Sequence, residues 1–247
     1  MVDADTVEQV MMGEVRGRAD ALDWCGIERA LDDGGHAVLP GLLAPAQCVA
    51  LAGLYAQAGL FRSRVVMERH GFGQGEYQYF DYPLPGVVQG LRAAVYPRLV
   101  PIANRWAALL RTGVRYPATH AEFVEHCHAA GQLRPTPLLL QYTAGDYNCL
   151  HQDLYGEQVF PLQLAVLLSR PGEDFEGGEF VLTQSRARRQ TRAEVVPLHQ
   201  GDAVLFAVHD RPVQGLHAPV KVAMRHGVSQ VRAGTRHTLG IIFHDAR

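Results

Sequence analysis

The C-terminal part of the chain changes pattern at Leu133, and this change constrains the fold more than any other feature of the sequence. Beyond it, short apolar and β-branched stretches alternate with turns of Gly, Pro and Asp. These stretches occupy residues 137–145, 160–169, 178–184, 193–198, 202–208 and 236–243. Six or more strands at this spacing are typical of an antiparallel sandwich or barrel. We therefore predict a β core over residues 133–247.

The part before this change, residues 1–132, favours helices, so the sequence predicts an α+β protein. Apolar residues recur at helical spacing in several stretches. Helices are predicted over residues 5–33, 45–59, 86–111 and 119–130. The first should break near Gly13 or Asp20, with Asp20 as the N-cap of its second piece. A short strand, 36–43, precedes the second helix. We expect the helices and the β core to form one functional unit.

Composition bounds the class of protein. A chain of 247 residues with 47% hydrophobic residues can bury a sizeable core. The formal net charge of -2 excludes a general polycation, so any contact with nucleic acid must come from a local patch. The four cysteines form no C-x-x-C pair, and the acidic N-terminus resembles no secretory signal. No run of about 18 apolar residues is present, so we predict a cytoplasmic protein without a membrane span. Its oligomeric state cannot be read from the sequence.

The stretch "CLHQDLYG" raises the question of a metal site. If it is extended, His151 and Asp153 project from the same face, because side chains alternate along a strand. One further imidazole would complete a two-His, one-carboxylate triad of the kind that binds non-haem Fe(II). Taken alone, the pair is weak evidence, because an Asp that fixes the tautomer of a neighbouring His has the same pattern.

A third ligand must come from a distant strand. The candidate histidines are His199, His209, His217, His226, His237 and His244. Arg236 begins an apolar stretch ten residues after His226, and a buried arginine binds a carboxylate bidentately. His226 and Arg236 could thus provide the iron ligand and the cation that a 2-oxoglutarate-dependent oxygenase needs. His209 is the alternative ligand, but it lies 27 residues before Arg236, and we favour His226.

The ordered set His151-x-Asp153, His226 and Arg236 resembles that of the Fe(II)/2-oxoglutarate-dependent dioxygenases. The likeness covers roughly residues 133–245, and three further stretches strengthen it, the last of them near the N-terminus at residues 36–51. They are "DFEGGEF", which resembles the Gly-Gly-Glu connection of prolyl hydroxylase-type members, "GDAVLF", which resembles the strand before the distal His, and "HAVLPGLLAPAQCVAL", which resembles the opening strand and helix of many members.

The resemblance implies a double-stranded β-helix, or jelly-roll, core with the N-terminal helices packed on it. It implies that His151, Asp153 and His226 bind Fe(II) and that Arg236 binds the distal carboxylate of 2-oxoglutarate. The family uses O2 to oxidise a C–H bond and releases succinate and CO2. Ascorbate is a candidate stimulant of this reaction.

The stretch "QYTAGDYNCLHQD" also resembles the AlkB-type nucleic-acid demethylases, and by that match Tyr142 would hydrogen-bond 2-oxoglutarate. The chain departs from that pattern in two places. Leu140 replaces an asparagine, and Ile242 replaces a second arginine six residues after Arg236. As a whole, the sequence resembles a bacterial group of oxygenases described as acting on alkylated DNA.

The prime substrate stays open at this stage. The resemblance favours oxidative demethylation of bases in single-stranded or damaged DNA or RNA. Hydroxylation of a protein side chain or a small metabolite is the alternative. A non-enzymatic, cupin-type binding domain is a third hypothesis, but such a domain has no need of open iron positions, and the complete His-Asp-His-Arg set argues against it.

Two stretches could contact a nucleic acid. Residues 61–85 form a candidate substrate lid, in which arginines that suit phosphates alternate with aromatics that suit stacked bases. The candidate residues are Arg62, Arg64, Arg69, Phe72, Tyr77, Tyr79 and Phe80. Equally, this lid could be a Gly-rich segment whose aromatics pack on the core. Four arginines in 185–192 could follow a DNA backbone, although a solvated face is the favoured interpretation.

"EHCHAAG" places His126, Cys127 and His128 together and invites comparison with a second metal site. On a helix, residues two apart point in different directions. We therefore predict ordinary surface and core roles for these three side chains.

Overall fold

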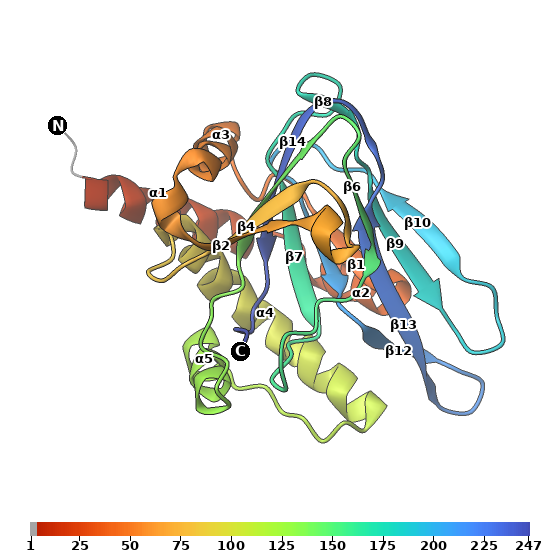
Figure 1. The fold of residues 1–247 in the computed structure, drawn as a ribbon. Coiled ribbons are helices and arrows are strands. Elements are labelled where there is room, and N and C mark those ends of the chain that lie inside the picture. The colour runs from red at the N-terminus through yellow and green to blue at the C-terminus, as the bar shows by residue number, and fades with distance from the viewer. Residues whose placement is uncertain (1–3) are drawn as a thin grey trace.

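Two antiparallel sheets face each other in the computed structural model, which describes residues 4–247, with side chains described from Met12 onward (Figure 1). The larger sheet has the strand order β1-β11-β7-β14-β5-β4-β2, and β8 also pairs with β14. Its strands are β1 (His36–Leu39), β2 (Phe61–Val66), β4 (Glu76–Phe80), β5 (Leu138–Thr143), β7 (Leu162–Leu167), β8 (Phe175–Gly177), β11 (Ala203–Ala207) and β14 (Val231–Ile241).

The smaller sheet has the order β10-β9-β13-β6-β3, and β12 pairs with β13. Its strands are β3 (Gly73–Gln74), β6 (Tyr147–His151), β9 (Phe180–Ser185), β10 (Arg192–Val196), β12 (Asp210–Gln214) and β13 (Pro219–Val228). The six strands predicted from apolar stretches are therefore confirmed. The sequence missed β8, β12 and β13, because polar or charged residues interrupt their apolar pattern.

The described residues form five α-helices. They are α1 (Ala4–Asp20), α2 (Trp24–Gly34), α3 (Pro45–Gly53), α4 (Gly86–Leu110) and α5 (His120–Ala129). The long α4 runs below the sheets and contacts β14 of the larger sheet as well as β12 and β13 of the smaller one (Figure 1). The predicted break near Asp20 is confirmed, but the predicted N-cap is wrong. The Asp23 carboxylate accepts the Gly26 amide at 3.0 Å, because α2 begins only at Trp24. Asp20 ends α1 and pairs with Arg98 instead.

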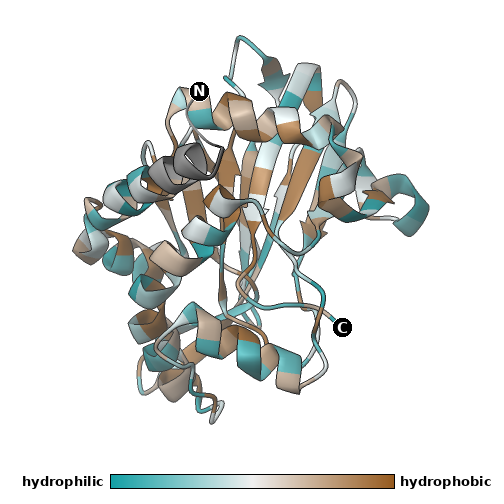
Figure 2. Ribbon diagram, turned by 90° about the vertical axis from the view of Figure 1, so that its left-hand side faces the viewer, coloured by the Kyte–Doolittle hydropathy of each residue, from teal (hydrophilic) through white to brown (hydrophobic). Residues whose placement is uncertain are grey.

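Alternation along the strands separates the core from the inner cavity. On β14, Leu239 and Ile241 pack into the main core beneath the helices. Arg236, Thr238 and Gly240 point the other way and line a cavity between the sheets. Figure 2, seen from the helical side, shows largely hydrophobic strands behind the helices. One face of the larger sheet therefore provides stability, and the opposite face provides a site.

Residues 61–85, predicted as a lid without clear periodicity, form ordered strands in their first part. β2 and β4 pair as a hairpin that extends the larger sheet, because β4 also pairs with β5. The short β3 joins the smaller sheet through β6. Strands from both sides of Leu133 thus share each sheet, and the segment closes one side of the cavity.

Among the described residues, no helix has both the length and the apolar character needed to cross a membrane.

Candidate metal centre and active site

Three of the predicted residues meet between the two sheets. His151 ends β6, Asp153 follows two residues later, and His226 lies on β13 directly opposite His151 in the strand register. One ligand atom from each lies within 4.8 Å of the other two. Within the described part of the chain, this is the cluster of His, Cys, Asp and Glu side chains that could hold a metal ion. His209, the alternative, is not in it.

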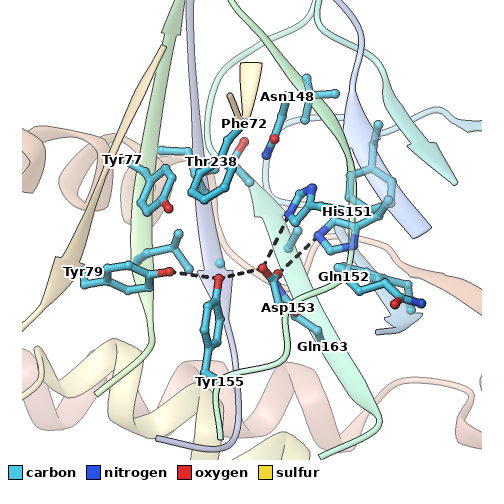
Figure 3. Close-up of a pocket in the computed structure, with 18 of the residues that line it drawn as sticks. Phe72, Tyr77, Tyr79, Asn148, His151, Gln152, Asp153, Tyr155, Gln163 and Thr238 are labelled. Atoms are coloured by element: carbon cyan, nitrogen blue, oxygen red, sulfur yellow. Dashed lines mark hydrogen bonds and ion pairs between the residues drawn. The ribbon is translucent and has the colours of Figure 1, made fainter. Parts of the chain in front are cut away.

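The nitrogen and oxygen atoms of the cluster converge on one point. His151 Nε2 lies 3.5 Å from Asp153 Oδ1, and His226 Nε2 lies 3.4 Å from Asp153 Oδ2 (Figure 3). Both distances exceed the roughly 2.7–2.9 Å of a charge-assisted hydrogen bond. His151 Nδ1 faces the carbonyl oxygen of Cys149 at 2.8 Å, which assigns its proton to Nδ1. The free lone pair of Nε2 then points at a carboxylate, and a cation between them would make that contact favourable.

The pKa values of Asp153 and His226 suit metal ligands, whereas the pKa of His151 is raised because the contact with Asp153 outweighs the effect of burial. Burial alone would raise the pKa of Asp153, but its contacts with the two imidazoles hold that pKa well below the ordinary range. Burial lowers the pKa of His226. Asp153 is therefore a carboxylate and His226 a neutral imidazole, the forms that bind metal ions.

The cluster opens into a cavity of about 220 Å³. Both sheets contribute to its wall, and apolar and aromatic side chains predominate. The lining includes Phe72, Tyr77, Tyr79, Leu138, Leu140, Asn148, Gln152, Tyr155, Gln163, Ala165, Phe180, Phe206, Val228, Arg236, Thr238 and Gly240. A concave, mostly apolar site with a few convergent polar groups is typical of small-molecule binding.

Arg236 is the cation of this cavity. Its side chain is only 2% exposed, and Nη1 donates to Thr238 Oγ1 at 2.5 Å. Nε has no hydrogen-bond partner, and no carboxylate of the described residues forms an ion pair with this guanidinium. Burial lowers its pKa to about 10, and the group still carries its charge at neutral pH. The buried Tyr142 hydroxyl also makes no hydrogen bond to the described residues. A carboxylate ligand such as that of 2-oxoglutarate fits these groups.

Two glycines make room for this cation and this hydroxyl. A Cβ on Gly178 would lie 2.8 Å from Arg236 Cδ, and Gly178 has a φ of +61°. A Cβ on Gly75 would lie 2.7 Å from Tyr142 Cδ1. Gly178 of the Gly-Gly-Glu connection is therefore required at its position, because the side chain of any larger residue would collide with Arg236.

The candidate substrate residues divide into two groups. Phe72, Tyr77 and Tyr79 line the cavity. Phe80 points to the opposite side, where it is buried in the main core and stacks on Phe61 with ring centroids 4.7 Å apart.

The three arginines of this segment do not line the cavity. The guanidinium of Arg62 lies 4.6 Å from the centre of the Tyr79 ring and donates to the carbonyl oxygen of Pro135. Arg64 pairs with Glu76, and Arg69 is exposed. No arginine of 185–192 lines the cavity either, and Arg188, Arg189 and Arg192 are exposed at the β9–β10 turn.

The "EHCHAAG" residues have the ordinary roles that were predicted. Cys127 is buried in the core, while His126 and His128 are exposed on α5. His128 contacts Asp245 at 3.0 Å.

Sequence reasoning missed Tyr155, whose hydroxyl donates to Asp153 Oδ1 at 2.7 Å (Figure 3). It also missed Gln163, which is buried on the cavity wall with an unpartnered Oε1. A signal for Tyr155 was present, because it lies two residues after Asp153 and an extended chain returns it to the same side. Gln163 gave no such signal within its apolar stretch.

Comparison with solved structures shows the fold. A prolyl hydroxylase from Trichoplax adhaerens, solved with a peptide of the hypoxia inducible factor oxygen degradation domain, superposes with a TM-score of 0.58 at 12% identity, covering 93% of this chain and 91% of that one. A 2OG-Fe(II) oxygenase family oxidoreductase from Burkholderia pseudomallei superposes with a TM-score of 0.53 at 16% identity, covering 92% and 93%. The predicted α+β fold with a jelly-roll core is confirmed.

Family comparison is more specific. Residues 75–246 match Oxygenase-NA, described as "Oxygenase, catalysing oxidative methylation of damaged DNA". Two uncharacterized proteins of Mycobacterium tuberculosis, from strains CDC 1551 and H37Rv, are each 46% identical over 167 residues, which is 68% of this chain and 72% of theirs. The chain belongs to the Oxygenase-NA family. It is therefore an oxygenase, and it carries a His-Asp-His cluster that could hold a metal ion.

Proposed function

We propose that His151, Asp153 and His226 hold Fe(II), and that the enzyme uses 2-oxoglutarate and O2 to demethylate alkylated nucleic-acid bases oxidatively. One observation carries the proposal. Among the described residues, Arg236 is the only buried arginine that lines the cavity, and it has no carboxylate partner. The same cavity contains the cluster of His151, Asp153 and His226. A co-substrate that carries its own carboxylate and chelates a metal satisfies both needs.

The chain's own residues would bind and orient the co-substrate. Arg236 binds the distal carboxylate, and the Tyr142 hydroxyl donates a second hydrogen bond to it. His151, His226 and the carboxylate of Asp153 would hold the metal. Bound Fe(II), together with 2-oxoglutarate and O2, would supply the oxidising chemistry that hydroxylates a C–H bond. The apolar wall excludes water from the reacting groups.

Two arguments support an alkylated base as the substrate. The family description names damaged DNA, and hydroxylation of an N-methyl group gives a hemiaminal that loses formaldehyde, so an oxygenase removes a methyl group rather than adding one. Phe72 and Tyr77 also line the cavity, and Phe72 is 49% exposed. Aromatic rings at such an entrance can stack a base that has been flipped out of its strand.

Hydroxylation of a protein side chain or a small metabolite is the second candidate. The position of the arginine run favours it, because residues 185–192 contribute nothing to the cavity wall. The net charge of -2 also gives no general attraction to phosphates.

The deciding experiment measures formaldehyde released from single-stranded oligonucleotides that carry N-methylated bases, with Asp153→Ala as the inactive control. We expect release that depends on 2-oxoglutarate, O2 and Fe(II). If no formaldehyde appears while a peptide or a metabolite stimulates succinate formation, the second candidate is correct.

A further inference from the structure

Two tyrosines form a hydrogen-bonded chain that ends on the carboxylate of the metal-type cluster. Tyr79 on β4 donates its hydroxyl proton to the Tyr155 hydroxyl at 3.0 Å, and Tyr155 donates to Asp153 Oδ1 at 2.7 Å (Figure 3). The chain thus connects the segment before Leu133 to the loop that follows β6. Because the 2.7 Å bond involves a carboxylate, it belongs to the stronger class of hydrogen bonds.

The loop that carries Tyr155 is held in place by the buried side chain of Gln132. Asp153 is buried, Leu154 is exposed and Tyr155 turns inward again, as expected for an extended stretch. The Gln132 amide donates to the carbonyl oxygen of Tyr155 at 3.1 Å, and Gln132 itself is completely buried. A Cβ on Gly156 would lie 2.5 Å from Gln132 Cδ, so a glycine is needed for this close approach. The Tyr155 hydroxyl therefore has a fixed position.

The surroundings of the two hydroxyls are apolar. Tyr79 is buried in a small cluster with Leu138 and Ile242, and Tyr155 packs against this cluster. Ile242 occupies the position at which AlkB-type sequences have a second arginine. A hydrogen bond in such surroundings is stronger than one in water. No other described side-chain hydroxyl or amide donates to Asp153.

We propose that Tyr155 is the positioning residue of the metal centre, and that Tyr79 orients Tyr155. The proposal rests on the proposed function of Asp153 as a metal ligand. Tyr155 holds Oδ1, the oxygen that faces His151, and leaves Oδ2, which faces His226, without a hydrogen bond from a hydroxyl. It would thereby fix how the carboxylate is turned toward a metal.

The expected effect follows from how outer partners act on metal ligands. Loss of a group that hydrogen-bonds a ligand costs about 10–100-fold in metal affinity. Tyr155→Phe retains the ring and removes the one hydroxyl, so we expect a fall in affinity of that size. Tyr79→Phe acts one bond further away and should cause a smaller fall in the same direction.

The experiment titrates Co(II) alone into the purified full chain and measures the dissociation constant and the visible absorption of the bound ion. Tyr82→Phe is the matched control. Its hydroxyl also donates to a buried carboxylate, that of Asp245 at 2.8 Å, but lies outside the cavity. We expect Tyr82→Phe to bind Co(II) as the wild type does. In Tyr155→Phe the freed Asp153 can offer both oxygens, so the absorption spectrum should change as well as the affinity.

The possible results separate the two proposals. Wild-type affinity and spectrum in Tyr155→Phe, together with loss of binding in Asp153→Ala, would overturn the positioning role and leave the metal site intact. A wild-type protein that binds no Co(II), or an Asp153→Ala variant that binds it normally, would overturn the metal site itself. If Tyr155→Phe does not fold, Tyr79→Phe decides, since wild-type binding by that variant contradicts the chain of hydrogen bonds.

Discussion

Two buried arginines have opposite surroundings. Arg92 on α4 is 0% exposed, and its Nη2 binds Asp245 Oδ1 and the carbonyl oxygen of Phe243, each at 2.9 Å. Arg236 on β14 is 2% exposed and has no carboxylate in reach among the described residues. A buried charge is costly unless it is paired. The first arginine is compensated by a carboxylate of the protein itself, and the second lines a cavity that a ligand could fill.

The surroundings of Asp245 extend this contrast. Its carboxylate contacts Tyr82, His128 and Arg92. The loop after β4, α5 and α4 therefore all bind the C-terminal segment through this one side chain. Asp153 in the cavity has two imidazoles at 3.4 and 3.5 Å instead of a cation. A buried carboxylate that is paired with a cation, as Asp245 is with Arg92, indicates a structural role, whereas the unpaired carboxylate of Asp153 on a cavity wall indicates a binding site.

The largest change in stability should come from the ion pair between Arg92 and Asp245. Arg92→Met removes the cation and leaves Asp245 buried without it, so the free energy of unfolding should fall by about 3–5 kcal/mol. Urea denaturation followed by circular dichroism measures this difference. A loss below about 1 kcal/mol, the usual size for an exposed ion pair, would remove the contrast between the two arginines.

Arg236→Met should act on the co-substrate instead. A hydrogen bond to a charged group contributes about 1.5–3 kcal/mol, which corresponds to roughly a 10–100-fold rise in the KM for 2-oxoglutarate. The free energy of unfolding without 2-oxoglutarate should not fall, because an uncompensated buried charge is removed. Steady-state kinetics and denaturation of the same preparation measure both quantities. An unchanged KM would show that another residue binds the carboxylate.

The smallest effect should come from the glycine behind Arg236. In Gly178→Ala the new Cβ displaces Arg236 Cδ, and a side chain forced off its rotamer costs about 0.5–1.5 kcal/mol, or roughly a 2–10-fold rise in KM. Gly172→Ala is the control, since Gly172 has a φ of +79° but nothing within 4 Å of its Cβ position. Both variants bear similar backbone strain. Equal KM values for the two variants would mean that Gly178 does not position the arginine.

Periodicity and motif order were sufficient for part of this molecule. The apolar strands were predictable because their pattern is local, and Arg236 was predictable because it directly precedes the apolar part of β14, although that strand begins five residues earlier at Val231. The preference for His226 over His209 rested on the spacing to Arg236, and the cluster contains His226.

Other features depend on contacts between distant residues. Arg92 and Asp245 are 153 residues apart, and neither stands out in its own segment. Phe80 and Tyr79 are both aromatic, yet they point to opposite faces of the sheet because they are neighbours on β4, and the pairing of β4 with β5 decides which face lines the cavity. The aromatic segment could therefore be identified as one unit, but its cavity-lining half could be separated from its core half only in the folded chain.

The central claim is that His151, Asp153 and His226 form the centre at which 2-oxoglutarate is oxidised. The most direct test measures succinate formed from 2-oxoglutarate under air, with one equivalent of Fe(II), by the wild type and by His151→Ala, Asp153→Ala and His226→Ala. We predict that the wild type forms succinate and that each variant loses this activity while remaining folded. Succinate formation at the wild-type rate by any one of the three variants would contradict the account.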